Sequence, residues 1–144
     1  MVQNPLLVGV DLGTTNIKAI VFEPNGAIVA AASVPTPTVY PRPTWAYHNP
    51  ADFWQKAAQA IRTAVKEVPH PERIVSVAAT STGETGFPLD AAGEATYESI
   101  AWFDGRTKAE AQWLDEQIGA DRLFAVTGLS LQPIFSLCKI LWLR

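Results

Sequence analysis

The chain has 144 residues, of which 48% are hydrophobic and 17% are charged, and its net charge is −3 at neutral pH. This length and composition are typical of one globular domain with a substantial core. The negative charge argues against nucleic acid or an anionic membrane surface as a partner, and a single cysteine excludes an internal disulfide or a cysteine-built metal site. No apolar run approaches the roughly 20 residues that cross a bilayer, and Asp11 interrupts the N-terminal one, so we expect a soluble cytoplasmic protein.

The first part of the chain predicts three strands followed by a helix. Apolar runs at 6–10, 17–22 and 27–34 are separated by turn residues, and such a pattern predicts an antiparallel meander. Four prolines between residues 35 and 49 exclude a regular element there. Asn49 and Pro50 are typical of a helix start, and apolar residues recur at helical spacing up to Val68.

The second part predicts shorter elements. A β-branched apolar run at 74–79 predicts a buried strand, and extended pieces follow near 87–89 and 99–103. Helices are expected at 106–118, at 121–126 and from about residue 135 onward. The order β-β-β-α-β-β-α-α predicts an α/β, RNase H-like domain over residues 1–144, with a mixed sheet and helices packed on its faces. We expect four tryptophans to be core or interface anchors: Trp45, Trp54, Trp113 and Trp142.

The turn between the first two predicted strands carries the strongest functional pattern. Residues 11–18 read Asp-Leu-Gly-Thr-Thr-Asn-Ile-Lys. Backbone amides around a tight turn bind anions, and glycine lets a phosphate approach the backbone closely. We therefore expect Gly13, Thr14, Thr15 and Lys18 to bind phosphates, and Asp11 to hold a hydrated Mg²⁺ ion. The alternative is an ordinary hairpin turn, which favours the same small residues.

A second candidate site lies in two loops further along the chain. Glu84 stands in a glycine-rich loop after the predicted strand at 74–79, and Trp102 and Asp104 end a later extended run. A sugar or polyol site needs carboxylates that accept hydroxyl hydrogens and an aromatic ring that covers the C–H face. These three residues are therefore candidate substrate ligands. The alternatives are a solvated loop acid for Glu84, core packing for Trp102 and a helix cap for Asp104.

Residues 11–18 resemble the first phosphate motif of the actin-like ATPase superfamily. Further along, residues 43–50, 100–107, 127–128 and 139–144 resemble, in the same order, segments of the FGGY carbohydrate kinases, so the resemblance covers residues 6–144. It implies ATP and Mg²⁺ as cofactors and a sugar or polyol hydroxyl as the phosphoryl acceptor. Glu84 and Trp102 match positions that contact the substrate in glycerol kinase, but Gly83 replaces the arginine that precedes this glutamate. The resemblance thus leaves the identity of the substrate open.

The resemblance also implies that this chain is the N-terminal part of a larger kinase. The general-base aspartate and the nucleotide-binding domain would then lie downstream, the 144 residues alone would not turn over, and a homo-oligomer is plausible. Two alternatives remain at this stage. An actin-like or Hsp70-like conformational ATPase would hydrolyse ATP without an acceptor, and a non-catalytic sugar-binding module would bind its ligand without turnover.

Overall fold

The computed structural model describes residues 4–144, which form two compact units. The first unit, which we call the sheet unit, contains the chain up to Pro37 together with Pro50–Thr82. The second, which we call the helical unit, contains Thr38–Asn49 and Gly83–Arg144. Two compact units can fold together as one domain or separately. The expectation of a single N-terminal domain therefore stays a prediction.

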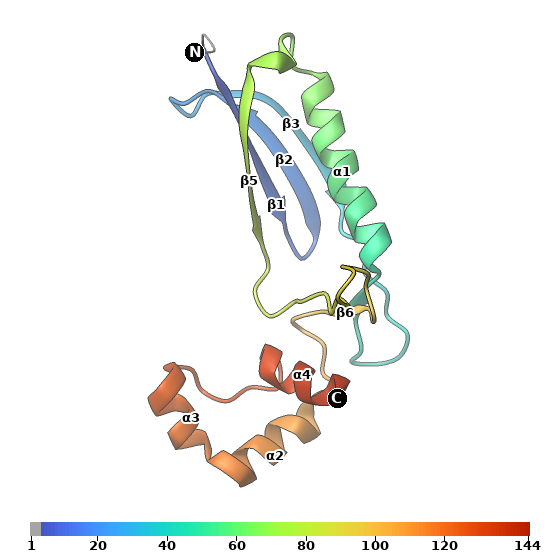
Figure 1. The fold of residues 1–144 in the computed structure, drawn as a ribbon, viewed down its shortest axis with the longest axis vertical. Coiled ribbons are helices and arrows are strands. Elements are labelled where there is room, and N and C mark those ends of the chain that lie inside the picture. The colour runs from blue at the N-terminus through green and yellow to red at the C-terminus, as the bar shows by residue number, and fades with distance from the viewer. Residues whose placement is uncertain (1–3) are drawn as a thin grey trace. The chain divides into compact units, whose positions relative to one another are not determined.

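The sheet unit is built on four strands in the order β3-β2-β1-β5 (Figure 1). They are β1 (Leu6–Leu12), β2 (Asn16–Phe22), β3 (Ile28–Pro35) and β5 (Ile74–Ser81). β1 pairs antiparallel with β2 and parallel with β5, and β2 pairs antiparallel with β3. The predicted meander and the mixed character of the sheet are therefore confirmed.

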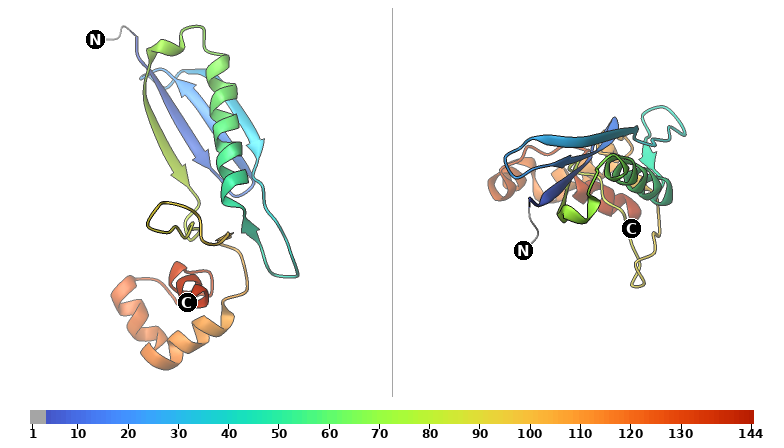
Figure 2. Two further views of the ribbon diagram at one scale, coloured as in Figure 1. Left: turned by 45° about the vertical axis from the view of Figure 1, so that its right-hand side comes forward. Right: turned by 90° about the horizontal axis from the view of Figure 1, so that it is seen from above.

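One helix, α1 (Pro50–Lys66), covers one face of this sheet by packing on β2 and β3 (Figure 2). Alternate strand residues point toward the helix, and the helix presents small residues at helical spacing, so the two periodicities meet in one core. A 3-10 turn, η1 (Pro71–Arg73), then leads into β5. The buried side chains of this core include Leu6, Val8, Val10, Ile17, Ala19, Val21, Phe53, Ala57, Ala60 and Ala64.

The burial of β5 differs from the sequence-based expectation. The strand forms where it was predicted, but Val75 and Val77 are 52% and 59% exposed. Within the described residues, no further strand pairs with its outer edge. An apolar, β-branched run shows that a strand is suited to burial, but it does not show what covers the strand.

Two of the four tryptophans are not core residues. Trp54 of α1 is 70% exposed and Trp113 is 50% exposed, so for these two only the interface role stays a prediction. Trp45 and Trp142 do pack together, edge to face, with 5.6 Å between their ring centroids.

The helical unit begins with a short strand pair in the segment that was expected to hold no regular element. β4 (Tyr47–His48) pairs antiparallel with β6 (Ser99–Ile100). The prolines of this segment all precede β4, so they leave the backbone N–H groups of the strand free to pair.

Three helices complete the helical unit: α2 (Lys108–Ile118), α3 (Ala120–Thr127) and α4 (Ser136–Leu143). Helix α2 packs with α3 and α4 around a small core of Ala111, Leu114 and Cys138. In residues 4–144, no helix has both the length and the apolar character needed to span a membrane.

Candidate functional site

The predicted phosphate turn joins β1 to β2 in the sheet unit. Asp11 of β1 lies opposite Lys18 of β2 and opposite Thr80 of β5. Directly paired residues project from the same face of a sheet, so these three polar side chains form one row. Their neighbours Val10 and Ala19 are buried toward α1, and the polar row therefore lies on the other face. Thr80 was not singled out from the sequence, since only the strand register brings it beside Asp11.

The turn itself has room for glycine alone at its first position. A Cβ atom on Gly13 would lie 2.7 Å from the backbone oxygen of Asn16, which is well inside van der Waals contact. Thr36 fixes the turn from the end of β3: its hydroxyl donates to the Gly13 carbonyl at 2.7 Å, and its amide donates to the Thr15 carbonyl at 3.0 Å. Thr36 was missed in the sequence because it lies 23 residues from Gly13.

An open hollow of about 690 Å³ lies over the polar row, and its lining includes Gly9, Asp11, Lys18, Phe22 and Thr80. This volume falls within the range of small-molecule and cofactor sites. The described residues contain no cluster of three or more acidic, histidine or cysteine side chains. A lone carboxylate at Asp11 suits Mg²⁺, which keeps several waters and is bound through one or two carboxylates plus phosphate oxygens.

In the helical unit, Glu84 is held by the first turn of α4. The backbone amide and the hydroxyl of Ser136 both donate to Oε2 of Glu84, the hydroxyl at 2.7 Å. The ammonium of Lys139 donates to the backbone carbonyl of Glu84. Burial lowers the pKa of Lys139 to about 8, although the negative charges of Glu84 and Asp104 oppose this shift. Sequence reasoning singled out neither Ser136 nor Lys139.

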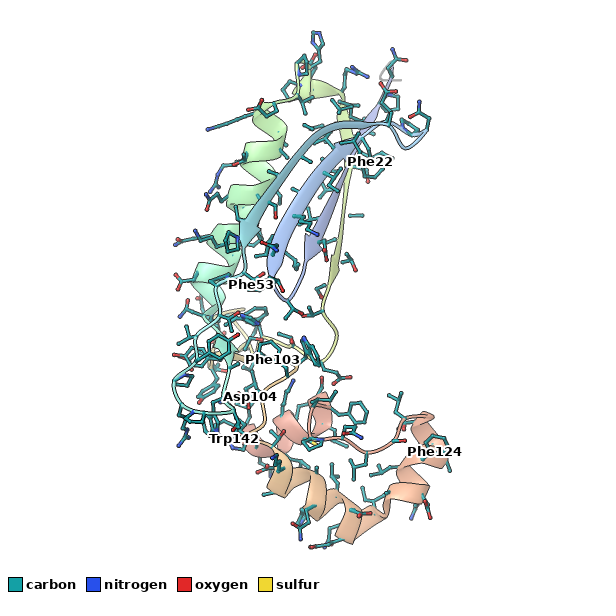
Figure 3. All side chains as sticks on the ribbon, turned by 180° about the vertical axis from the view of Figure 1, so that it is seen from behind. Phe22, Phe53, Phe103, Asp104, Phe124 and Trp142 are labelled. Atoms are coloured by element: carbon teal, nitrogen blue, oxygen red, sulfur yellow. The ribbon has the colours of Figure 1, made fainter. Side chains whose placement is uncertain are left out.

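Asp104 is 1% exposed, and its carboxylate is engaged inside the protein. It accepts hydrogen bonds from the Ala46 amide at 2.5 Å and from the Arg106 amide at 2.8 Å, and its two oxygens also receive the Arg106 guanidinium. Burial alone would raise the pKa of Asp104, but these bonds outweigh it and hold the pKa below its ordinary value of 3.8. Figure 3 shows Asp104 between the labelled Phe103 and Trp142.

Trp102 is 39% exposed, and its ring meets that of Phe103 edge to face at 5.5 Å. Core packing, the alternative reading of this residue, is thus only partial. The structure places Glu84, Trp102 and Asp104 in one compact unit. Contact of any of them with a substrate stays a prediction.

Residues 6–144 match the model of the N-terminal domain of the FGGY family of carbohydrate kinases. The chain belongs to this family. The glycerol kinases of Gloeobacter violaceus and Leifsonia xyli are 36% and 32% identical to it over 138 and 139 residues. These alignments cover 95% of this chain but only 27% and 28% of the two relatives, so the chain spans less than a third of their length.

Solved structures of carbohydrate kinases agree with this assignment. The xylulose kinase of Rhodospirillum rubrum is 28% identical with a TM-score of 0.86, covering 96% of this chain and 28% of the other. The gluconate kinase of Lactobacillus acidophilus, at 24% identity over the same shares of the two chains, reaches a TM-score of 0.87 and shows the common fold. The family resemblance and the RNase H-like α/β class predicted from the sequence are both confirmed. The roles of individual site residues are not tested by these matches.

Proposed function

We propose that this chain supplies the phosphate-binding turn and the acceptor-binding loop of an ATP-dependent carbohydrate kinase. The reaction is transfer of the γ-phosphoryl group of ATP to a hydroxyl of a sugar or polyol. The observation that carries this proposal is the family match over residues 6–144, and its relatives are kinases of glycerol, xylulose and gluconate. A conformational ATPase and a non-catalytic module are disfavoured by the same match.

The phosphate end of the reaction belongs to the sheet unit. Phosphoryl transfer is catalysed mainly by positioning and by electrostatic stabilisation of phosphate charge. Phosphate oxygens would find hydrogen-bond donors and positive charge here: the backbone amides of the tight turn at Gly13, the hydroxyls of Thr14 and Thr15, and the ammonium of Lys18. We propose that Asp11 orients Mg²⁺ through coordinated water, and that Thr36 keeps the turn in its binding conformation.

The acceptor end belongs to the helical unit. We propose that the Glu84 carboxylate accepts hydrogen bonds from acceptor hydroxyls and that the exposed part of Trp102 covers a C–H face. Because Gly83 precedes Glu84, no arginine stands there to donate a hydrogen bond to the acceptor. This favours an acceptor that needs no positively charged donor at that point. A direct contact of Asp104 with the acceptor would require its buried carboxylate to exchange one of its internal hydrogen bonds.

The remaining parts of the proposal rest on the family alone. A general base must accept the proton of the acceptor hydroxyl, and we place it, as an aspartate, outside residues 1–144 together with the adenine pocket. The isolated chain is then expected to show no turnover. We further propose a cytoplasmic enzyme with a small-molecule sugar or polyol as partner, acting without nucleic acid or membrane. A homo-oligomer is compatible with this proposal.

The test is acceptor-dependent release of ADP by the full-length protein over a panel of polyols, ketoses and sugar acids, with a control that lacks any acceptor. Release that depends on one acceptor supports the proposal. Release that is equal with and without every acceptor would identify a conformational ATPase, and acceptor binding without ADP release would identify a binding module. Glu84→Gln should raise the KM for the acceptor, whereas Glu94→Gln, at an exposed position of the same segment, should not.

A further inference from the structure

The backbone of Glu84 is held in an unfavourable conformation. Its φ is +58°, in the left-handed region that side chains other than glycine and asparagine seldom adopt. Such a conformation is unfavourable for a side chain of this size and persists only where the surroundings of the residue determine it. Glycines stand on either side of this short stretch, at positions 83 and 86, so the neighbouring backbone does little to restrain it. The restraint must come from elsewhere in the fold.

Helix α4 supplies that restraint at two points. Ser136, its first residue, donates its amide and its hydroxyl to Oε2 of the Glu84 side chain. Lys139 lies one turn later on the same helix face and donates its ammonium to the Glu84 carbonyl. One contact thus fixes the carboxylate and the other fixes the backbone. Both Ser136 bonds end on Oε2, and the first amide of a helix favours a negative charge.

The burial of Lys139 supports the interpretation that α4 restrains Glu84. Its side chain is 5% exposed, although a lysine at that depth loses the hydration of its ammonium group. In α4 the neighbouring positions are apolar, and a leucine or methionine there would extend the small core of the unit. A buried charge that reaches one specific carbonyl is therefore better explained by what it positions than by its contribution to packing.

We propose that Ser136 and Lys139 are positioning residues that hold Glu84 in its left-handed conformation, with Oε2 engaged by α4 and Oε1 directed to the acceptor hydroxyl. This inference rests on the proposed function, in which Glu84 is an acceptor ligand. It extends that function to residues 52 and 55 positions away in the sequence. Loss of either contact would release the loop and so weaken binding of the acceptor, but it would leave the phosphate turn of the sheet unit unaffected.

The first test is steady-state kinetics of full-length Ser136→Ala and Lys139→Met, with Ser136→Thr as the conservative variant and Lys108→Met, at an exposed position, as the matched control. Hydrogen bonds to charged groups are among the stronger ones in proteins, so we expect the acceptor KM to rise about 10-fold or more. The KM for ATP should change less than about 2-fold, and Ser136→Thr should retain most of the wild-type affinity. Folded variants with an unchanged acceptor KM would overturn the proposal.

A double-mutant comparison separates positioning from a general structural role. In a Glu84→Ala background, Ser136→Ala should add little to the rise in acceptor KM, because the carboxylate that Ser136 holds is already absent. Fully additive effects would overturn the assignment of Ser136 to Glu84.

Hydrogen exchange of the amides at residues 83–86 gives a readout that does not depend on turnover. Both Ser136→Ala and Lys139→Met should speed this exchange, whereas Lys108→Met should not. If the wild-type protein phosphorylates no acceptor but the exchange accelerates as expected, the proposed function fails while the restraint of Glu84 by α4 stands. If turnover is present and neither exchange nor acceptor KM changes, the positioning role is wrong.

Discussion

Asp104 and Arg106 form a buried two-point ion pair, in which Nε lies 2.8 Å from Oδ1 and Nη2 lies 2.8 Å from Oδ2. The guanidinium also stacks on two indole rings, with its central carbon 3.9 Å from the centroid of Trp45 and 5.0 Å from that of Trp142. The pair therefore joins three segments of the helical unit: the loop that contains Trp45 and Ala46, the segment before α2 and the end of α4. The ion pair thereby holds in place the loop that carries Trp102, two residues before Asp104.

Replacement of Asp104 by asparagine should destabilise the protein strongly. The amide would leave the Arg106 guanidinium buried without a counter-charge, and breaking a buried pair in this way typically costs about 3–5 kcal/mol. Urea denaturation followed by circular dichroism measures the loss. Asp121→Asn, at an exposed position of α3, is the matched control and should change the free energy of unfolding by less than about 1 kcal/mol. A similar small effect for Asp104→Asn would contradict the role given to the pair.

The same residue makes a prediction about acid. Its pKa is lowered in the folded protein, so the unfolded chain takes up the proton first as the pH falls. The stabilisation by Asp104 is fully present above its ordinary value of 3.8 and is lost as the pH drops through the lower folded value. The difference in unfolding free energy between wild type and Asp104→Asn should consequently narrow below pH 3.8. A constant difference down to pH 2.5 would show that the carboxylate is not the titrating group.

Lys139 makes a prediction of the same sign at alkaline pH. Its pKa is lowered from 10.5 to about 8 by burial, so between these values the unfolded chain still holds a proton that the folded chain has released. The free energy of unfolding should therefore rise with pH in this window, relative to Lys139→Met, and be constant relative to it well below pH 8. Urea denaturation at pH 7, 9 and 10.5 measures this, with Lys108→Met as the control for loss of a lysine. Parallel profiles for wild type and Lys139→Met would refute it.

The sequence predicted the local elements of this fold well, because their signals are local. The strands around Gly13 follow from apolar runs and turn residues, and α1 follows from its cap and its spacing of apolar residues. The candidate residues Asp11 and Glu84 were found for the same reason, since each stands in a recognisable short motif. Their roles as metal and acceptor ligands stay predictions.

What the sequence did not predict depends on contacts between distant segments. Thr36 and Ser136 are separated from the residues that they hold by 23 and 52 positions, and serine or threonine has no spacing pattern that reveals such a contact. Asp104 was expected to bind a substrate or cap a helix, but its engagement with the Ala46 amide depends on a loop 58 residues earlier. The exposure of Val77 likewise follows from which elements pack on β5, and strand composition does not encode this.

Gly13→Ala should impair phosphate binding selectively. The added Cβ would lie 2.7 Å from the Asn16 oxygen, so the turn must shift, and overpacking of this kind costs about 1–3 kcal/mol. In the full-length protein we expect a higher KM for ATP with little change in the acceptor KM. Gly86→Ala is the control, because no atom lies within 4 Å of its added Cβ and its φ is not positive. An unchanged ATP KM for a folded Gly13→Ala protein would remove the turn from the phosphate site.

Val77→Lys should reduce self-association of the 144-residue chain. Val77 is 59% exposed on β5, and the outer edge of this strand is unpaired within residues 4–144. An exposed, apolar edge strand is a template for pairing with another chain, and lysine on such a strand opposes that pairing through charge. Because the side chain is mostly exposed, the free energy of unfolding should change by less than about 1 kcal/mol. Light scattering and size-exclusion chromatography over a range of concentrations measure the association.

Val126→Lys adds the same charge at an 80% exposed position of α3 and is the matched control. If both variants reduce association equally, net charge is the cause; if neither does, the edge of β5 is not the site through which the chains associate.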